Sequence, residues 1–293
     1  MLSAFGTVRL NLLPMNPYPP AIVHPPRASL PVLLSVPHSG RDYDAGILAN
    51  ASQGRLALEA LEDPLVDRLA WRAISAGIGA VVQPVPRAVI DCNRDEEEVD
   101  PAAIRNISPA PVGPRARHGL GLIPSRTHRH GALWRQPIDR AELARRVDQV
   151  HRPYHALIAA GLADMAARFG EVVLVDCHSM PTRAAPNADV VIGDRNGSSA
   201  SGWLTAEVAR IVRSEGFRTA LNDPYAGGAI VARHGRPELG VHAIQLEIDR
   251  GCYLDRDGRT AGAEFDRIAR MLEQVALQLG DMLSDRAFPI AAE

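Results

Sequence analysis

The run Glu171-Val-Val-Leu-Val-Asp-Cys-His-Ser179 decides the fold class of this chain. Its four consecutive aliphatic residues predict a buried strand, because a strand covered on both faces carries an uninterrupted apolar sequence. A helical pattern precedes the run and ends at Gly170. A helix followed by such a strand is the unit from which mostly parallel sheets are built.

Helices and strands continue to alternate on both sides of this run. We expect strands at 31–37, 189–193, 229–232 and 241–248, and either two strands or one interrupted strand at 80–85 and 88–90. We also expect a long ordered loop or a cluster of short pieces over 95–137, and helices from Asp63-Pro64 onward and at 140–169, 203–216 and 261–283. Asp63 is expected to cap its helix, and Pro153 to kink the helix that contains it. The pattern predicts one α/β domain over residues 30–293, a mixed, mostly parallel sheet flanked by helices on both faces. An extended proline-rich arm is expected over 1–29.

Composition excludes several functions. Hydrophobic residues make up 46% and charged residues 23% of the chain, which is typical of a globular protein with a core. The net charge of -2 leaves no overall field for nucleic acid or an anionic membrane, and all 32 basic residues are arginine, which excludes a Schiff-base lysine. The three cysteines are far apart, and residues 1–20 carry no signal-peptide pattern, so we expect a reducing cytoplasm.

Polar residues gather where the expected strands end. These residues are His38, Asp91, Asn93, Arg94, His178 and Glu247. Ligand sites of open α/β sheets lie outside the carboxyl ends of the strands, so these side chains can converge. Two imidazoles and one carboxylate form a zinc site with one open position. We therefore expect His38, His178 and Asp63 as metal ligands, with Asp67 as the alternative carboxylate.

Each candidate also has a structural interpretation. A single histidine after a strand is usually a hydrogen-bonded core residue, and a strand-borne acid such as Glu247 is usually ion-paired, here to Arg250 or Arg233. Ser179 or Cys177 could instead be a nucleophile, although neither lies in a GxSxG elbow or a cysteine-protease motif.

The polar segments between the strands carry further expectations. We expect the acidic run 95–98 to face away from the site and the segment 128–130 to form a turn rather than a lid. Tyr154 and His155 are expected to brace the core. The role of the arginine- and histidine-rich loop 115–135 stays open.

Seven motifs occur in the order found in N-formylglutamate amidohydrolases, and the chain resembles that family over roughly residues 30–255. The motifs are Ser35-Val-Pro-His-Ser-Gly40, Glu62-Asp-Pro-Leu-Val-Asp-Arg-Leu69, Val89-Ile-Asp-Cys-Asn-Arg94, Arg152-Pro-Tyr-His155, Val175-Asp-Cys-His-Ser179, Gly227-Gly-Ala-Ile and Gly240-Val-His-Ala-Ile-Gln-Leu-Glu-Ile248. The family is similar to zinc carboxypeptidases and aspartoacylases. Those relatives use a His-x-x-Glu motif, whereas His38-Ser-Gly-Arg41 has no acid at that place, so either Asp63 replaces it or the metal shell is different.

The resemblance implies roles for the site residues. It implies one Zn²⁺ ion held by His38, Asp63 and His178, with Glu247 as the general base, while iron, cobalt or manganese also suit these ligands. Asn93 and Arg94 resemble the carboxypeptidase pair that binds the substrate's α-carboxylate. For a second carboxylate we expect Arg233 with His234 after the Gly227-Gly228 turn, or else Arg135; each could instead be a surface arginine.

The expected function is zinc-dependent hydrolysis of N-formyl-L-glutamate, a small anionic substrate, to formate and L-glutamate, as in histidine breakdown. Three alternatives remain open: a deacylase or peptidase for another N-acyl amino acid or small peptide, a non-catalytic binding protein on the same fold, and a serine or cysteine hydrolase.

Overall fold

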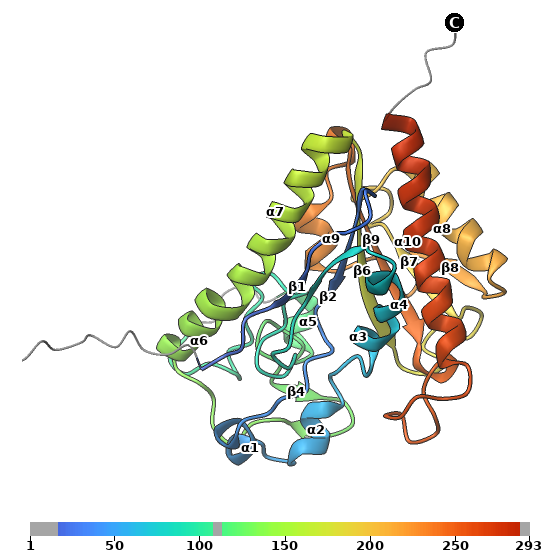
Figure 1. Cartoon of the computed structure of the whole chain (residues 1–293). Helices are drawn as coiled ribbons and strands as arrows, with labels where there is room; N and C mark the ends of the chain where they lie inside the picture. Colours follow the sequence, from blue (N-terminus) through green and yellow to red (C-terminus); the bar gives the residue numbers. More distant parts are fainter. Residues whose placement is uncertain (1–16, 108–112, 288–293) are drawn as a thin grey trace, which may run out of the picture.

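The computed structural model describes residues 17–107 and 113–287, and Figure 1 shows their arrangement. This part of the chain contains a seven-stranded sheet with the strand order β1-β3-β2-β6-β9-β7-β8. Its strands are β1 (Ile22–His24), β2 (Val32–Val36), β3 (Gly79–Val82), β6 (Val172–Met180), β7 (Val190–Gly193), β8 (Thr219–Leu221) and β9 (Val241–Asp249). β1 is antiparallel to β3 and β7 to β9, and the other neighbours are parallel. The predicted mixed, mostly parallel sheet is confirmed.

Helices cover both faces of the sheet (Figure 1). One face carries the continuous helical run α6 (Arg140–Arg146), η1 (Val147–His151) and α7 (Arg152–Phe169), together with α9 (Ala229–His234). The other face carries α3 (Val66–Leu69), α4 (Trp71–Ser75), α8 (Gly202–Ser214) and α10 (Phe265–Ala287). Short elements complete the described chain: α1 (Ala45–Asn50), α2 (Arg55–Glu59), α5 (Pro114–Arg117), η2 (Pro237–Leu239), η3 (Arg250–Cys252) and a hairpin of β4 (Arg126–Thr127) and β5 (Gly131–Ala132). None of the helices described is long and apolar enough to cross a membrane.

The alternation of side chains along β2 explains the two cores. Val32 and Leu34 pack against the layer of α3, α4, α8 and α10, whereas Leu33 packs against the α7 layer. All three side chains are at most 4% exposed. Because both faces of the strand are buried, its sequence is apolar throughout. Burial of each such side chain contributes roughly 1.5–3 kcal/mol to folding.

Two predicted strands are wrong. Residues 229–232 form the start of helix α9, and residues 88–90 form a turn in which the Val89 amide donates to the Pro86 carbonyl at 2.9 Å. A short apolar run is compatible with either a strand or a buried helical turn, which explains the first error. At the second position, Pro84 and Pro86 lack backbone donors and separate residues 88–90 from β3, which ends at Val82.

The expected helix cap at Asp63 is also wrong. Helix α3 begins at Val66, and the residue before it, Leu65, has a left-handed φ of 62°. Asp63 instead donates its backbone amide to the His38 carbonyl at 3.0 Å. The carboxylate is therefore free to point toward the site rather than back to the helix.

The helix with Pro153 and the proline-rich arm each carry an expectation from the sequence. Pro153 lies inside the continuous helical run, directly after the π-helical turn η1, which accommodates the missing amide proton, and the kink itself stays a prediction. Residues 22–24 of the proline-rich arm form β1 and pair with β3, so this part of the arm belongs to the sheet. Residues 1–16 of that arm lie outside the described residues.

Candidate metal centre

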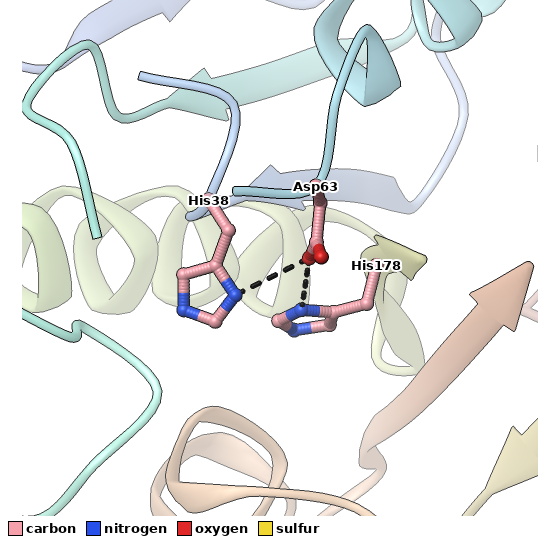
Figure 2. Close-up of side chains that lie close together, drawn as sticks. All are labelled: His38, Asp63 and His178. Atoms are coloured by element: carbon pink, nitrogen blue, oxygen red, sulfur yellow. Dashed lines mark hydrogen bonds and ion pairs between the residues drawn. The ribbon is translucent and has the colours of Figure 1, made fainter. Parts of the chain in front are cut away.

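Three buried side chains from distant parts of the chain meet at the carboxyl end of the sheet (Figure 2). His38 follows β2, Asp63 precedes α3, and His178 lies near the end of β6. Nδ1 of His38 is 3.3 Å and Nδ1 of His178 is 3.0 Å from the same oxygen, Oδ2 of Asp63. One ligand atom from each residue lies within 4.8 Å of the others, which is unique among the described residues. The three atoms converge as a metal-ligand set does.

A buried carboxylate orients each imidazole. Nε2 of His38 is 2.8 Å from Oδ1 of Asp91, and Nε2 of His178 is 2.8 Å from Oδ2 of Asp176. A proton held on Nε2 by these acids leaves a lone pair on Nδ1, the atom that faces Asp63. Histidines that bind metals commonly have such a carboxylate behind the ring.

The charges around the three residues favour a bound cation. Burial by itself would raise the pKa of Asp63, but hydrogen bonds with His178 and His38 hold that pKa well below its usual range. Burial by itself would lower the pKa of His178, but the nearby Asp176 and Asp63 raise it well above its usual range. Negative charge strong enough to keep a proton on a buried imidazole also attracts a metal ion.

The donor set fits zinc. Two imidazole nitrogens and one carboxylate oxygen match a three-ligand zinc site that leaves one position open, and iron, cobalt and manganese accept the same donors. Asp67, the alternative carboxylate, pairs with the guanidinium of Arg41 at 2.8 and 3.1 Å. The group of converging ligand atoms contains Asp63 and not Asp67.

A cavity of about 650 Å³ opens onto the three residues. Glu247 lines this cavity and lies beside His178, because the two residues are register partners on the neighbouring strands β9 and β6. Its Oε1 accepts a hydrogen bond from Nε2 of Gln245 at 2.8 Å. Burial raises the pKa of Glu247 to about 7. Glu247 is therefore a buried carboxylate of raised pKa that lines the cavity beside the candidate metal ligands.

The ion pairs considered for Glu247 are absent among the described residues. Arg250 instead contacts Oδ1 of Asp63 at 3.1 Å, and Arg233 lies 3.9 Å from Glu96. The carboxylate is thus not neutralised by either arginine.

The polar turn after residue 90 forms one wall of the cavity. Nδ2 of Asn93 lies 3.2 Å from Nε2 of His178, and its Oδ1 accepts a bond from the amide of Ile230 at 2.9 Å. Nε of Arg94 donates to the carbonyl of Leu120 at 2.7 Å. Both predicted substrate-binding residues of this turn line the metal cavity.

The loop whose role the sequence leaves open forms another part of the wall. It contributes Arg115, His118, Leu120, Arg126, Thr127 and His128. The segment 128–130 is therefore not only a solvated turn.

Arginine dominates the charged lining of the cavity. The lining arginines are Arg87, Arg94, Arg115, Arg126 and Arg250, against the two carboxylates Asp63 and Glu247. Of these arginines, only Arg94 is predicted from the sequence as a ligand contact. The sequence signal that could have indicated Arg87 is its position four residues before Asp91. In the structure its Nε donates to Oδ2 of that acid at 2.8 Å. The charged side chains that line the cavity are thus mainly cationic.

The remaining predicted substrate contacts lie outside the metal cavity in the described part of the chain. Gly227, Gly228 and Arg233 line a neighbouring cavity of about 480 Å³, which shares Arg115 with the first. Arg135 is exposed in the loop after β5. Nε2 of His234 lies 2.9 Å from Nδ1 of His155 in a buried pair. None of these residues lines the cavity of the candidate metal ligands.

Two expectations about residues outside the site agree with the structure. The acidic run faces the neighbouring cavity through Asp95 and Glu98, while Glu96 pairs with Arg152 at 2.8 Å. Tyr154 is fully buried and bonds Oγ of Ser35 at 2.8 Å, which braces β2 against α7.

Neither candidate nucleophile has the surroundings that activation requires. Cys177 is packed in the core, where burial raises the pKa of its thiol. Oγ of Ser179 lies 3.1 Å from Nε of Arg250 and 3.4 Å from Oδ1 of Asp63, and it has no imidazole partner among the described residues. The pKa of the Asp63 carboxylate is held well below its usual range, so this neighbour is too weak a base to activate the serine.

Comparison with known proteins places the chain in a family. The model of the N-formylglutamate amidohydrolase family matches residues 30–254. The chain is 29% identical over 238 residues to an N-formylglutamate deformylase of Pseudomonas aeruginosa, covering 78% of this chain and 84% of the relative. A deformylase of Pseudomonas putida is 27% identical, covering 77% and 82%. The crystal structure of an N-formylglutamate amidohydrolase from Ralstonia eutropha superposes with a TM-score of 0.83 and 31% identity, covering 90% of this chain and 98% of that one.

Proposed function

The chain belongs to the N-formylglutamate amidohydrolase family, and from this premise we propose that it hydrolyses N-formyl-L-glutamate to formate and L-glutamate with a bound divalent metal ion, zinc in the simplest case. The observation that carries the proposal is the convergence of His38, Asp63 and His178 beside Glu247. The relatives named N-formylglutamate deformylase support the choice of substrate.

His38, Asp63 and His178 would hold the ion. When bound, a divalent ion supplies Lewis acidity, which lowers the pKa of a water from 15.7 to about 7 and polarises an amide carbonyl. The side chains behind the ligands act differently, because Asp91 and Asp176 keep each imidazole in one orientation and one tautomer.

Glu247 moves the proton in this proposal. Its carboxylate takes a proton from the attacking water and delivers it to the nitrogen of the departing glutamate. A pKa of about 7 suits both halves of that transfer, because the group is then neither too weak a base nor too weak an acid near neutral pH.

Asn93 and Arg94 would bind the α-carboxylate. Arg94 is 5% exposed and lines the cavity, and its guanidinium bonds the carbonyls of Leu120 and Asn93. These bonds fix the direction of the guanidinium fork before substrate arrives, which lowers the entropy lost on binding.

The decisive experiment is turnover by Glu247→Gln with metal content measured on the same sample. The variant should retain stoichiometric metal and lose about 10² to 10⁴ in kcat, the usual contribution of a positioned general base. Glu238→Gln, on the exposed turn η2, is the matched control and should keep full activity.

Two outcomes would refute the proposal. Full turnover by Glu247→Gln would exclude this residue as the base, and formate release that survives complete chelation would exclude the metal. A protein that binds metal and acyl-amino acids but hydrolyses none would be the non-catalytic binder, and a panel of other N-acyl amino acids identifies a different deacylase.

A further inference from the structure

We propose that Arg115 binds the side-chain carboxylate of the substrate and thereby makes this site selective for N-acyl amino acids with an acidic side chain. The inference rests on the proposed hydrolysis and deepens it by assigning the second carboxylate contact. The sequence places that contact at Arg233 or Arg135, neither of which lines the metal cavity.

Arg115 is the cavity arginine without a partner. Among the described residues its guanidinium has no ion pair and no hydrogen bond, although it lines the cavity and is partly buried. The other lining arginines, Arg87, Arg94, Arg126 and Arg250, bond to Asp91, the carbonyl of Leu120, the carbonyl of Arg117 and Asp63 respectively. A cation that faces a cavity without a protein partner is available to a ligand.

The backbone holds Arg115 close to Arg94. The amide of Leu120 donates to the Arg115 carbonyl at 2.9 Å, and the Leu120 carbonyl accepts from Nε of Arg94 at 2.7 Å. Burial first, and then the charges of Arg87 and Arg115, lower the pKa of Arg94 to about 10. The two arginines thus line one cavity with like charges that repel one another.

A dicarboxylate resolves this repulsion. Its side-chain carboxylate can pair with Arg115, which has no counter-charge among the described residues, and its α-carboxylate can pair with Arg94, which also lies 3.6 Å from Asp91. The planar fork of arginine matches a carboxylate in two parallel hydrogen bonds. An amide of the same shape offers only one acceptor and no charge, so it is the appropriate comparison.

Three substrates separate the two carboxylates: N-formyl-L-glutamate, N-formyl-L-glutamine without the side-chain charge, and N-formyl-L-isoglutamine without the α-carboxylate. In the metal-loaded enzyme, Arg115→Gln should lower kcat/KM for the glutamate and isoglutamine substrates by about 10- to 100-fold and leave the glutamine substrate within about threefold. The loss should appear mainly in KM, and Arg115→Lys should recover part of it.

Arg117→Gln is the matched control. It removes the same charge from the same short helix, α5, but Arg117 does not line the cavity, so all three rates should stay at the wild-type level. An equal loss on all three substrates in Arg115→Gln, or a loss confined to substrates that retain the α-carboxylate, overturns the assignment. Unchanged rates on all three overturn it as well.

A binding measurement distinguishes failure of this inference from failure of the proposed function. If the wild-type protein hydrolyses none of the three substrates, the proposed function fails. Calorimetry with L-glutamate and L-glutamine then still tests Arg115. Tighter binding of glutamate by wild type and Arg117→Gln, abolished in Arg115→Gln, supports the assignment, and equal binding of both ligands by all three proteins overturns it.

Discussion

Asp63 and Asp67 are one helical turn apart in the sequence, yet their carboxylates have different partners. The Asp63 carboxylate meets the Nδ1 atoms of two histidines, whereas Asp67 forms a two-point ion pair with Arg41. Asp63 is 2% exposed, so its charge has no solvent to compensate for a lost partner. The two residues therefore offer a matched pair of substitutions.

Asp63→Asn should lose the metal and Asp67→Asn should keep it. The amide of asparagine is a weaker ligand than a carboxylate and removes one of the charges that attract the ion. We expect metal affinity to fall by about 10- to 100-fold or more in Asp63→Asn, because loss of a residue that only hydrogen-bonds to a ligand already has an effect of that size. Elemental analysis and competition with a chromophoric chelator measure it. Stoichiometric metal in Asp63→Asn together with loss in Asp67→Asn would reverse the assignment of the ligand.

The sequence predicts the converging residues better than their supporting partners. His38 and His178 follow from the rule that parallel strands end at one edge of the sheet, whereas Asp63 was expected from a helix start that the structure places at Val66. Asp176 was not assigned a role, although it is two residues before His178 on one strand and so shares its face. The period of the strand is a signal that could have found it.

The arginines of the cavity are harder to predict. Arg115, Arg126 and Arg250 reach the cavity from loops whose paths depend on backbone hydrogen bonds between distant segments, such as the amide of Asp91 to the Leu122 carbonyl at 2.8 Å. No local pattern encodes such a bond, and in a chain with 32 arginines the residue type alone does not discriminate.

At the level of elements, strands were predictable where the apolar run is long and bounded. The run around residue 174 and the run that ends near Glu247 both form strands of nine residues. The short run at residue 229 became helix α9, because four apolar residues satisfy either period. Strand β8 was missed because it has three residues and is not fully buried.

The loop that carries α5 depends on close backbone packing at Gly121. A Cβ atom there would lie 2.5 Å from the carbonyl oxygen of Glu98 and 3.1 Å from Cβ of Ala116. Gly121→Ala should therefore displace the loop and raise KM for N-formyl-L-glutamate, while the metal content stays the same, because the metal ligands lie elsewhere. Steady-state kinetics with elemental analysis measure both effects.

Gly202→Ala is the control for that substitution. Gly202 begins α8, and a Cβ atom there meets no heavy atom within 4 Å, so the variant should behave as wild type. Loss of metal from Gly121→Ala, or equal kinetic effects of both variants, would show that the loop does not act on substrate binding alone.

For the whole molecule, the family resemblance seen in the motifs is confirmed, and with it the amidohydrolase class and the α/β architecture. The seven motifs that carry the family resemblance lie far apart in the sequence, and the sheet brings most of them to one edge. The family could therefore be predicted from the sequence. The residues that contact the substrate could not, because they lie in the loops.

The candidate ligands come from three segments that are well separated along the chain, so metal removal should affect global stability. A bound ion that is absent from the unfolded chain stabilises the fold by about 4.1 kcal/mol at a free concentration 1,000 times its Kd. Chelation should lower the Tm of the wild-type protein by several degrees, and added zinc should restore it. Asp63→Asn should show neither change. A wild-type Tm that is insensitive to chelator, in protein shown to have contained metal, would contradict this.

The link through Leu120 has a consequence for how such an enzyme can diversify. Leu120 joins the two arginines with its main-chain amide and carbonyl, so side-chain replacement at this position leaves the link in place. The reacting groups, in contrast, sit on or beside the rigid strands β2, β6 and β9. Substitutions in the segment that carries Arg115 and Leu120 can therefore change which acyl-amino acid is bound, while the reacting groups on and beside the strands stay the same.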